Sequence, residues 1–266
     1  MRSNGGFKIF TCLLGLITIV AIIWGACRHF SLGGIIVDPG PIVSDTKTLD
    51  AFHSIDAKVA AGGVVIQEGS TFSVEYTYPE KYIPQFEVKN DTLIITQKTK
   101  KNTFNLDLNS LNSDNWKLTL TIPEGTKMDD VTFILSMGSI EGSGLTFGDV
   151  KIVADMGSIE FTDTTFRSGV MDADMGAIDL ATCNFDKLSL DADMGAIDVK
   201  DCTFDSLSAD ADMGGITVSG TFDSLKADCD MGSIEVTTDS DPSYELVCDM
   251  GGITINGEDM GRKYKK

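Results

Sequence analysis

Aspartates recur at a fixed interval through the second half of the sequence, and they are the side chains best suited to chemistry. One set directly precedes Met-Gly pairs: Asp155, Asp174, Asp193, Asp212, Asp230 and Asp249. A second set lies two residues earlier: Asp172, Asp191, Asp210 and Asp228. Carboxylate oxygens suit hard cations such as Ca²⁺, so we predict that these columns form ladders that bind divalent cations. The alternative is a solvated acidic face, with the Asp before each Met-Gly pair hydrogen-bonding the turn.

Residues typical of catalysis are scarce in this region. Both histidines, His29 and His53, precede it, and Arg167 is the only arginine among the repeats. We therefore predict that the protein is not an enzyme and needs no cofactor, apart from the Ca²⁺ considered above. A pair of outward-facing aspartates is geometrically suited to glycoside hydrolysis, and a polysaccharide-acting enzyme is the minor alternative.

The cysteines of the repeats fall into two pairs that are in phase with the repeat. Cys183 and Cys202 share one column, and Cys229 and Cys248 share another. Side chains stacked in parallel have strained disulfide geometry, so we predict small buried thiols. A metal site of Cys and His is not indicated, because no His is nearby and no Cys-x-x-Cys occurs.

These side chains are positioned by an internal repeat. Met-Gly pairs begin at Met137, Met156, Met175, Met194, Met213, Met231 and Met250, always 19 residues apart except for one interval of 18. An Ile follows three residues after each Met, and a Phe column runs in phase through Phe147, Phe166, Phe185, Phe204 and Phe222. A fixed period of this length indicates a stacked array. The interval of 18 fits one deletion between Val218 and Phe222.

Each repeat alternates polar and apolar residues with the period of a strand. Leu188, Leu190, Ala192 and Met194 fall on one face, and the aspartates fall on the other. The sequence therefore predicts an all-β fold, a single-stranded β-helix of 19-residue rungs over residues 137–261, with a Gly at each corner. Ladders of Met, Ile and Phe are expected to fill its core.

The flanking regions are less regular. Residues 51–136 read as strands, with candidates at 51–59, 63–67, 72–78, 92–97, 117–122 and 131–135, and we expect atypical rungs or a small capping sheet. Residues 262–266 form a basic tail that we expect to cover the last edge.

The N-terminus has the pattern of a membrane anchor. Residues 9–27 form an uncharged, mostly apolar segment that is just long enough to span a bilayer as a helix. The basic residues before it favour a short cytoplasmic segment at 1–8, with a Gly- and Pro-containing tether at 28–50 and everything beyond it outside the cell. Cleavage as a signal peptide is one alternative. Lipid attachment at Cys27 is the other, because Gly25-Ala26-Cys27 resembles the end of a lipobox.

The formal net charge is −19. Such an acidic surface repels phosphate backbones, so nucleic acid is not an expected partner. Cations or basic patches on a partner protein are favoured instead.

The repeated Gly-x-Ile-acidic-hydrophobic unit, as in Gly157–Phe161 and Gly195–Val199, resembles a bacterial family known as "putative adhesin" or toastrack, which includes LiaG-like proteins. The resemblance spans roughly residues 50–258. It implies a β-helix outside the membrane, often beside envelope-stress or signalling proteins, and no catalytic residues. Members commonly have Asn or Ser where this chain has Met before the Gly.

Two non-enzymatic functions are consistent with these features. The first is a regulatory or sensor module of the cell envelope that docks on another membrane protein, because the expected cytoplasmic segment is too short to transmit a signal. The second is a surface adhesin or scaffold, although no long stalk or wall-attachment motif is present. We favour the first.

Overall fold

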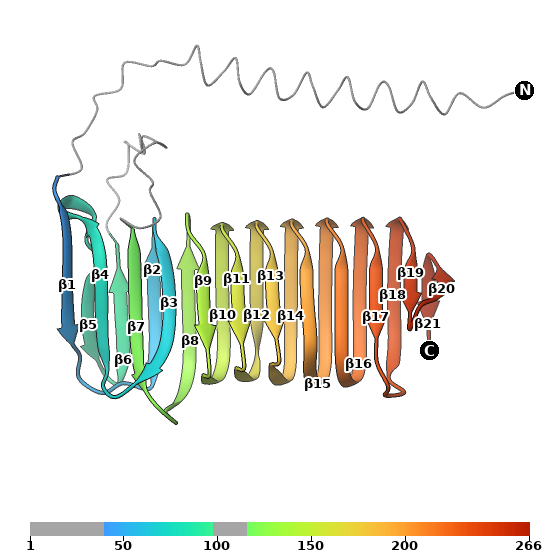
Figure 1. Cartoon of the computed structure of the whole chain (residues 1–266), viewed down its shortest axis with the longest axis horizontal. Coiled ribbons are helices and arrows are strands. Elements are labelled where there is room, and N and C mark those ends of the chain that lie inside the picture. The colour runs from blue at the N-terminus through green and yellow to red at the C-terminus, as the bar shows by residue number, and fades with distance from the viewer. Residues whose placement is uncertain (1–39, 98–115) are drawn as a thin grey trace, which may run out of the picture. The chain divides into compact units, whose positions relative to one another are not determined.

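Each 19-residue repeat forms one long strand and one short strand, joined by the Met-Gly corner (Figure 1). The computed structural model describes residues 40–97 and 116–266. The long strands are β8 (Lys127–Leu135), β10 (Thr146–Met156), β12 (Thr165–Met175), β14 (Asn184–Met194), the later parts of β15 (Ile197–Met213) and β16 (Ile216–Met231), and β18 (Ser243–Met250). The short strands are β9 (Ile140–Ser143), β11 (Ile159–Thr162), β13 (Ile178–Ala181), the first parts of β15 and β16, β17 (Ile234–Thr237) and β19 (Ile253–Ile255).

Parallel pairing places each residue beside its equivalent in the next rung. Met156 pairs with Met175, and Ile159 pairs with Ile178. The predicted β-solenoid is therefore confirmed. The shortened repeat is accommodated where Cys202 pairs with Gly220, after a register shift that follows Val199, so the predicted deletion lies at a corner.

The core consists of stacked apolar side chains. The Ile at the start of each short strand is fully buried, as at Ile197 and Ile216. The rings of Phe185 and Phe204 stack in parallel with centroids 4.6 Å apart, and Phe222 continues this stack. No single rung encloses its apolar face, so burial is achieved only by stacking.

From Met156 onward, the methionines of the Met-Gly pairs do not belong to this core, contrary to the prediction. Met175, Met194 and Met213 expose 43%, 45% and 44% of their surface. The prediction was wrong because it extended the strand alternation through the Met, whereas the chain turns at the Met-Gly pair. A side chain at that turn lies on the outside of the corner, next to the Asp that precedes it.

The glycine after each Met is required by the stacking of the corners. A Cβ on Gly195 would lie 1.8 Å from the carbonyl oxygen of Gly176, and one on Gly214 would lie 1.7 Å from that of Gly195. These separations are far below van der Waals contact, so only Gly lets the rungs approach at this point.

The N-terminal strands continue the stack and then cap it. β2 (Ser54–Val59) and β3 (Gly63–Gly69) pair in parallel with β8 and β9, and β6 (Thr92–Thr96) and β7 (Lys117–Pro123) pair in parallel with β2 and β3. Antiparallel strands then follow: β4 (Ser73–Pro79) beside β7, β1 (Ile42–Thr48) beside β4, and β5 (Gln85–Lys89) beside β6. A 3₁₀ turn, η1 (Glu80–Tyr82), joins β4 to the segment before β5. Both expected forms, extra rungs and a capping sheet, are present.

Part of the range predicted as a tether, 28–50, is a strand instead. Residues 42–48 form β1, which pairs with β4 along its whole length. Its side chains are almost all exposed, so the strand carries little of the periodic apolar signal by which strands are recognised.

The C-terminal residues cover the other end of the stack. β20 (Glu258–Gly261) pairs antiparallel with β19, and β21 (Lys263–Lys265) pairs antiparallel with β18. Lys265 lies 3.8 Å from a carboxylate oxygen of Glu245, and Lys266 contacts Asp241. The basic tail therefore blocks the last edge, as expected.

The predicted cytoplasmic segment (1–8), anchor (9–27) and lipid attachment site (Cys27) lie outside the described residues. Within residues 40–97 and 116–266, no helix has the length and apolar character needed to cross a membrane.

Candidate functional site

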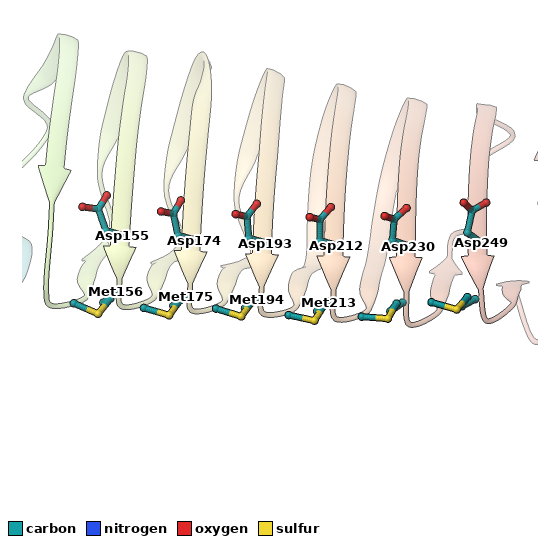
Figure 2. Close-up of a pocket in the computed structure, with 12 residues that line it drawn as sticks. Asp155, Met156, Asp174, Met175, Asp193, Met194, Asp212, Met213, Asp230 and Asp249 are labelled. Atoms are coloured by element: carbon teal, nitrogen blue, oxygen red, sulfur yellow. The ribbon is translucent and has the colours of Figure 1, made fainter. Parts of the chain in front are cut away.

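A shallow groove runs across the rungs beside the Met-Gly corners, and we call it the Met–Asp groove (Figure 2). It is lined by six Asp-Met pairs, from consecutive rungs: Asp155–Met156, Asp174–Met175, Asp193–Met194, Asp212–Met213, Asp230–Met231 and Asp249–Met250. Its volume is about 970 Å³. Figure 2 shows the carboxylates in one row and the methionine side chains in a second row parallel to it.

The methionine row is a concentrated apolar surface. Eight large hydrophobic side chains are exposed among the described residues, and six of them are these methionines; the other two are Ile42 and Val170. Contiguous exposed apolar surface on a soluble domain marks an interaction site more often than scattered single residues do. Methionine is flexible and polarisable, so such a row adapts to differently shaped partners.

The aspartate row gives the groove its charge. The aspartates of the groove are exposed, except for Asp155, which is partly exposed. Neighbouring rungs are about 4.8 Å apart, so successive carboxylates repel each other by about 1 kcal/mol even in water. This repulsion is relieved by any ligand that brings positive charge into the groove.

The second predicted column also forms a ladder, beside the groove. Asp172, Asp191, Asp210 and Asp228 pair in register on successive long strands. Partial burial, and then the neighbouring carboxylates, raise the pKa of Asp172, Asp191 and Asp210 above the ordinary Asp value.

The structure brings all ten predicted aspartates into two parallel lines. It does not gather them into a closed metal site: in the part of the chain that the structure describes, no three His, Cys, Asp or Glu side chains surround one common metal position. Cation binding along the ladders stays a prediction.

A third acidic ladder, which the sequence analysis did not single out, lies on the short strands. Glu141, Glu160, Asp179 and Asp198 pair in register there. Burial and then neighbouring acidic groups raise the pKa of Glu160 and Asp179. An acidic residue follows the Ile of the first four of these short strands, at Ile140, Ile159, Ile178 and Ile197, and this was a visible signal for the ladder.

The four cysteines of the repeats are buried free thiols, as predicted. The backbone N–H of Cys183 donates a hydrogen bond to Sγ of Cys202 at 3.3 Å, and Cys229 pairs in register with Cys248. Burial raises the pKa of Cys229 to about 12, so it is protonated at neutral pH. These thiols are core residues.

His53 and Arg167 are residue types that are common in active sites, but here each is paired with a carboxylate at the surface. Nδ1 of His53 lies 3.0 Å from both carboxylate oxygens of Asp91. Arg167 binds Asp149 through two nitrogens, and this hydrogen bonding lowers the pKa of the Asp149 carboxyl. Neither pair lines the Met–Asp groove.

Comparison with known proteins identifies the fold. A structure described as a "putative adhesin" from Bacteroides fragilis NCTC 9343 is 17% identical, with a TM-score of 0.61 over 82% of this chain and 98% of that chain. Another, described as a "putative lipid binding protein" from Parabacteroides distasonis ATCC 8503, is 19% identical, with a TM-score of 0.49 over 81% of this chain and 97% of that chain. A search of curated proteins finds no match.

At 17% identity the likeness to the Bacteroides fragilis structure concerns the fold alone. The family model for Toastrack DUF4097 matches residues 52–260, which include β2 to β19 and therefore all the rungs of the solenoid. This chain therefore belongs to the Toastrack DUF4097 family.

Proposed function

We propose that the protein is a membrane-anchored, extracytoplasmic, non-catalytic binding module whose ligand surface is the Met–Asp groove. The observation that carries this proposal is the exposure of the same large apolar residue, methionine, at the same corner of six successive rungs. Surface positions that serve only solubility are normally polar. Repetition of an exposed methionine therefore suits a binding role.

Packing explains the glycine of the Asp-Met-Gly unit but not its other two residues. The glycine has no room for a Cβ, whereas the methionine fills no core and the aspartate faces solvent. The burial of the core therefore does not account for either side chain. A ligand that needs both apolar contact and negative charge accounts for the pair.

The charge of the groove restricts its partner. Nucleic acids and anionic lipid surfaces are repelled by the carboxylates. A positively charged protein surface is attracted, and the attraction also accelerates the encounter. In the cell envelope, a module tethered by residues 9–27 would meet such a surface on a neighbouring membrane protein and regulate it by docking.

Site-specific photocrosslinking in cells that express the tagged full-length chain tests this function. A photoreactive amino acid replaces Met194 in the groove, or Glu235 on the short-strand side as the matched control. We expect one discrete membrane protein to be captured from position 194 only, and the capture to disappear when Asp193 and Asp212 are changed to Lys. Equal labelling from both positions, or none from position 194 in a displayed and folded protein, would overturn the proposal.

A surface adhesin is the second candidate, and the solved relative described as a "putative adhesin" supports it only at the level of fold. In the same experiment, an adhesin would crosslink to wall polymers or to a foreign surface through position 194, with no membrane protein captured.

A further inference from the structure

The Met–Asp groove has a repeat distance that limits the shape of its ligand. Its two rows, carboxylate and thioether, recur once per rung, and the stacked rings of Phe185 and Phe204 give a rung spacing close to 4.6 Å. From Met156 to Met250 there are five rung intervals, so each row is roughly 24 Å long. A matching ligand must present positive charge and apolar surface side by side over that length.

Recognition in this groove must occur through side chains. The corner backbone is already bonded between rungs: the Gly157 N–H donates to the Met175 carbonyl at 3.0 Å, and the Gly195 N–H donates to the Met213 carbonyl at 3.1 Å. A ligand that adds as a β-strand needs an unpaired sheet edge. The groove crosses the rungs and offers none.

Helix geometry fits the repeat better than strand geometry does. Side chains on one face of an extended strand recur about every 6.8 Å, which misses the rung spacing by about 2 Å at each step. One turn of an α-helix rises about 5.4 Å, so the mismatch with the 4.6 Å spacing is only about 0.8 Å per rung. Flexible Met and Lys side chains absorb that difference, and about 16 helical residues span the groove.

The surroundings of the groove exclude two other occupants. A second copy of this chain carries the same net charge of −19, so two grooves repel each other. The basic C-terminal residues of the chain already contact Glu245 and Asp241 at the end of the stack. Exclusion of these two occupants leaves a basic segment of another protein as the occupant that we consider.

We propose that the Met–Asp groove binds an amphipathic basic helix of a partner protein, lying parallel to the solenoid axis. Lys or Arg side chains on one stripe of the helix contact the aspartate row, and apolar side chains on the adjacent stripe pack on the methionine row. This inference rests on the proposed function, because it names the chemistry of the partner at the same groove.

The test uses the full-length protein in nanodiscs of zwitterionic lipid and an 18-residue peptide of Leu and Lys that carries one benzophenone. In the first peptide the Lys and Leu residues lie on two adjacent stripes of a helix. The second has the same composition in scrambled order, and the third has two central prolines that break the helix. Labelled residues are mapped by mass spectrometry.

We expect the first peptide to label the methionine row and the other two to label it at least about tenfold less, since each loses several weak contacts at once. Changing Asp174, Asp193 and Asp212 together to Asn should reduce the labelling about tenfold, and so should changing Met175, Met194 and Met213 together to Ser. The matched variant with Leu at those three methionines should retain it, because it keeps the apolar surface.

Two results would overturn the helix proposal. Equal labelling by the scrambled peptide would mean that the groove attracts any polycation. Absence of groove labelling by all three peptides would exclude this ligand chemistry. In either case the crosslinking from position 194 in cells still decides the proposed function separately, because it does not depend on the peptide.

Discussion

Gly176 and Gly195 approach each other so closely that a Cβ on Gly195 would lie 1.8 Å from the Gly176 carbonyl oxygen. The Met-Gly corners of successive rungs are therefore packed backbone against backbone. The Met–Asp groove lies directly beside these corners, so its two rows of side chains stand on a rigid support.

Replacing Gly195 with Ala should destabilise the protein by about 3 kcal/mol, because the added methyl group must push two rungs apart. The measurement is the free energy of unfolding in urea. Gly252→Ala is the matched control, since a Cβ at Gly252 has no neighbour within 4 Å and should change stability by less than about 1 kcal/mol. Similar losses in the two variants would contradict the close packing of the corners.

Replacing Met194 with Ser should change the free energy of unfolding by only about 0.5 kcal/mol, because the side chain is 45% exposed. Ile197→Ala, three residues later, should cost about 2–5 kcal/mol because Ile197 is fully buried. Thermal or urea unfolding of the two variants makes the comparison. A large loss of stability for Met194→Ser would mean that the Met194 side chain packs in the core.

The aspartate ladder beside the groove, formed by Asp172, Asp191, Asp210 and Asp228, should make the protein more stable as the pH falls toward the ordinary Asp pKa. Burial and like-charge repulsion raise the pKa of Asp191 and Asp210 in the folded state. Protonation is therefore easier in the folded than in the unfolded chain, and this contribution is present at low pH and lost as the pH rises through the folded-state pKa.

The measurement for the ladder is the melting temperature as a function of pH for the wild-type protein and for Asp191→Asn with Asp210→Asn. The double variant should be more stable at neutral pH and should lose part of the rise on acidification. The lowered pKa of Asp149 opposes this trend at more acidic pH. An identical pH profile for the two proteins would contradict the raised pKa of Asp191 and Asp210 in the folded state.

If the aspartate ladders bind divalent cations, millimolar Ca²⁺ should raise the melting temperature above its value in chelator, because a ligand that binds only the folded state stabilises it. The increase should be reduced when Asp191, Asp193, Asp210 and Asp212 are changed to Asn. An unchanged melting temperature in the wild-type protein would reject the cation ladders. Stabilisation that survives the four substitutions would place the cation elsewhere.

Cys183, Cys202, Cys229 and Cys248 should resist alkylation by a maleimide in the native protein and react fully in denaturant, because they are buried. Mass spectrometry of each peptide reports them separately from the other two cysteines of the chain. Cys229→Ala should cost about 1 kcal/mol or less, because the same column holds Ala at Ala173, Ala192 and Ala211. Rapid alkylation of the folded protein would contradict their burial.

The sequence by itself determined the solenoid, because stacked rungs repeat the same environment at the same position. That requirement leaves a 19-residue period in Ile, Phe and Gly that can be read directly, and even the shortened repeat could be assigned to a corner. The two columns of aspartates could be aligned for the same reason. Non-repeating strands such as β1, whose pairing with β4 is antiparallel and whose side chains are mostly exposed, left no comparable signal.

Only the tertiary structure decided which way the methionines face. A period of two assigns each residue to a face while the strand lasts, but it does not show at which residue the strand turns into a corner. Met194 continues the apolar alternation of Leu188, Leu190 and Ala192, yet the corner turns it outward beside Asp193. The groove exists because that turn places an apolar and a charged side chain next to each other on every rung.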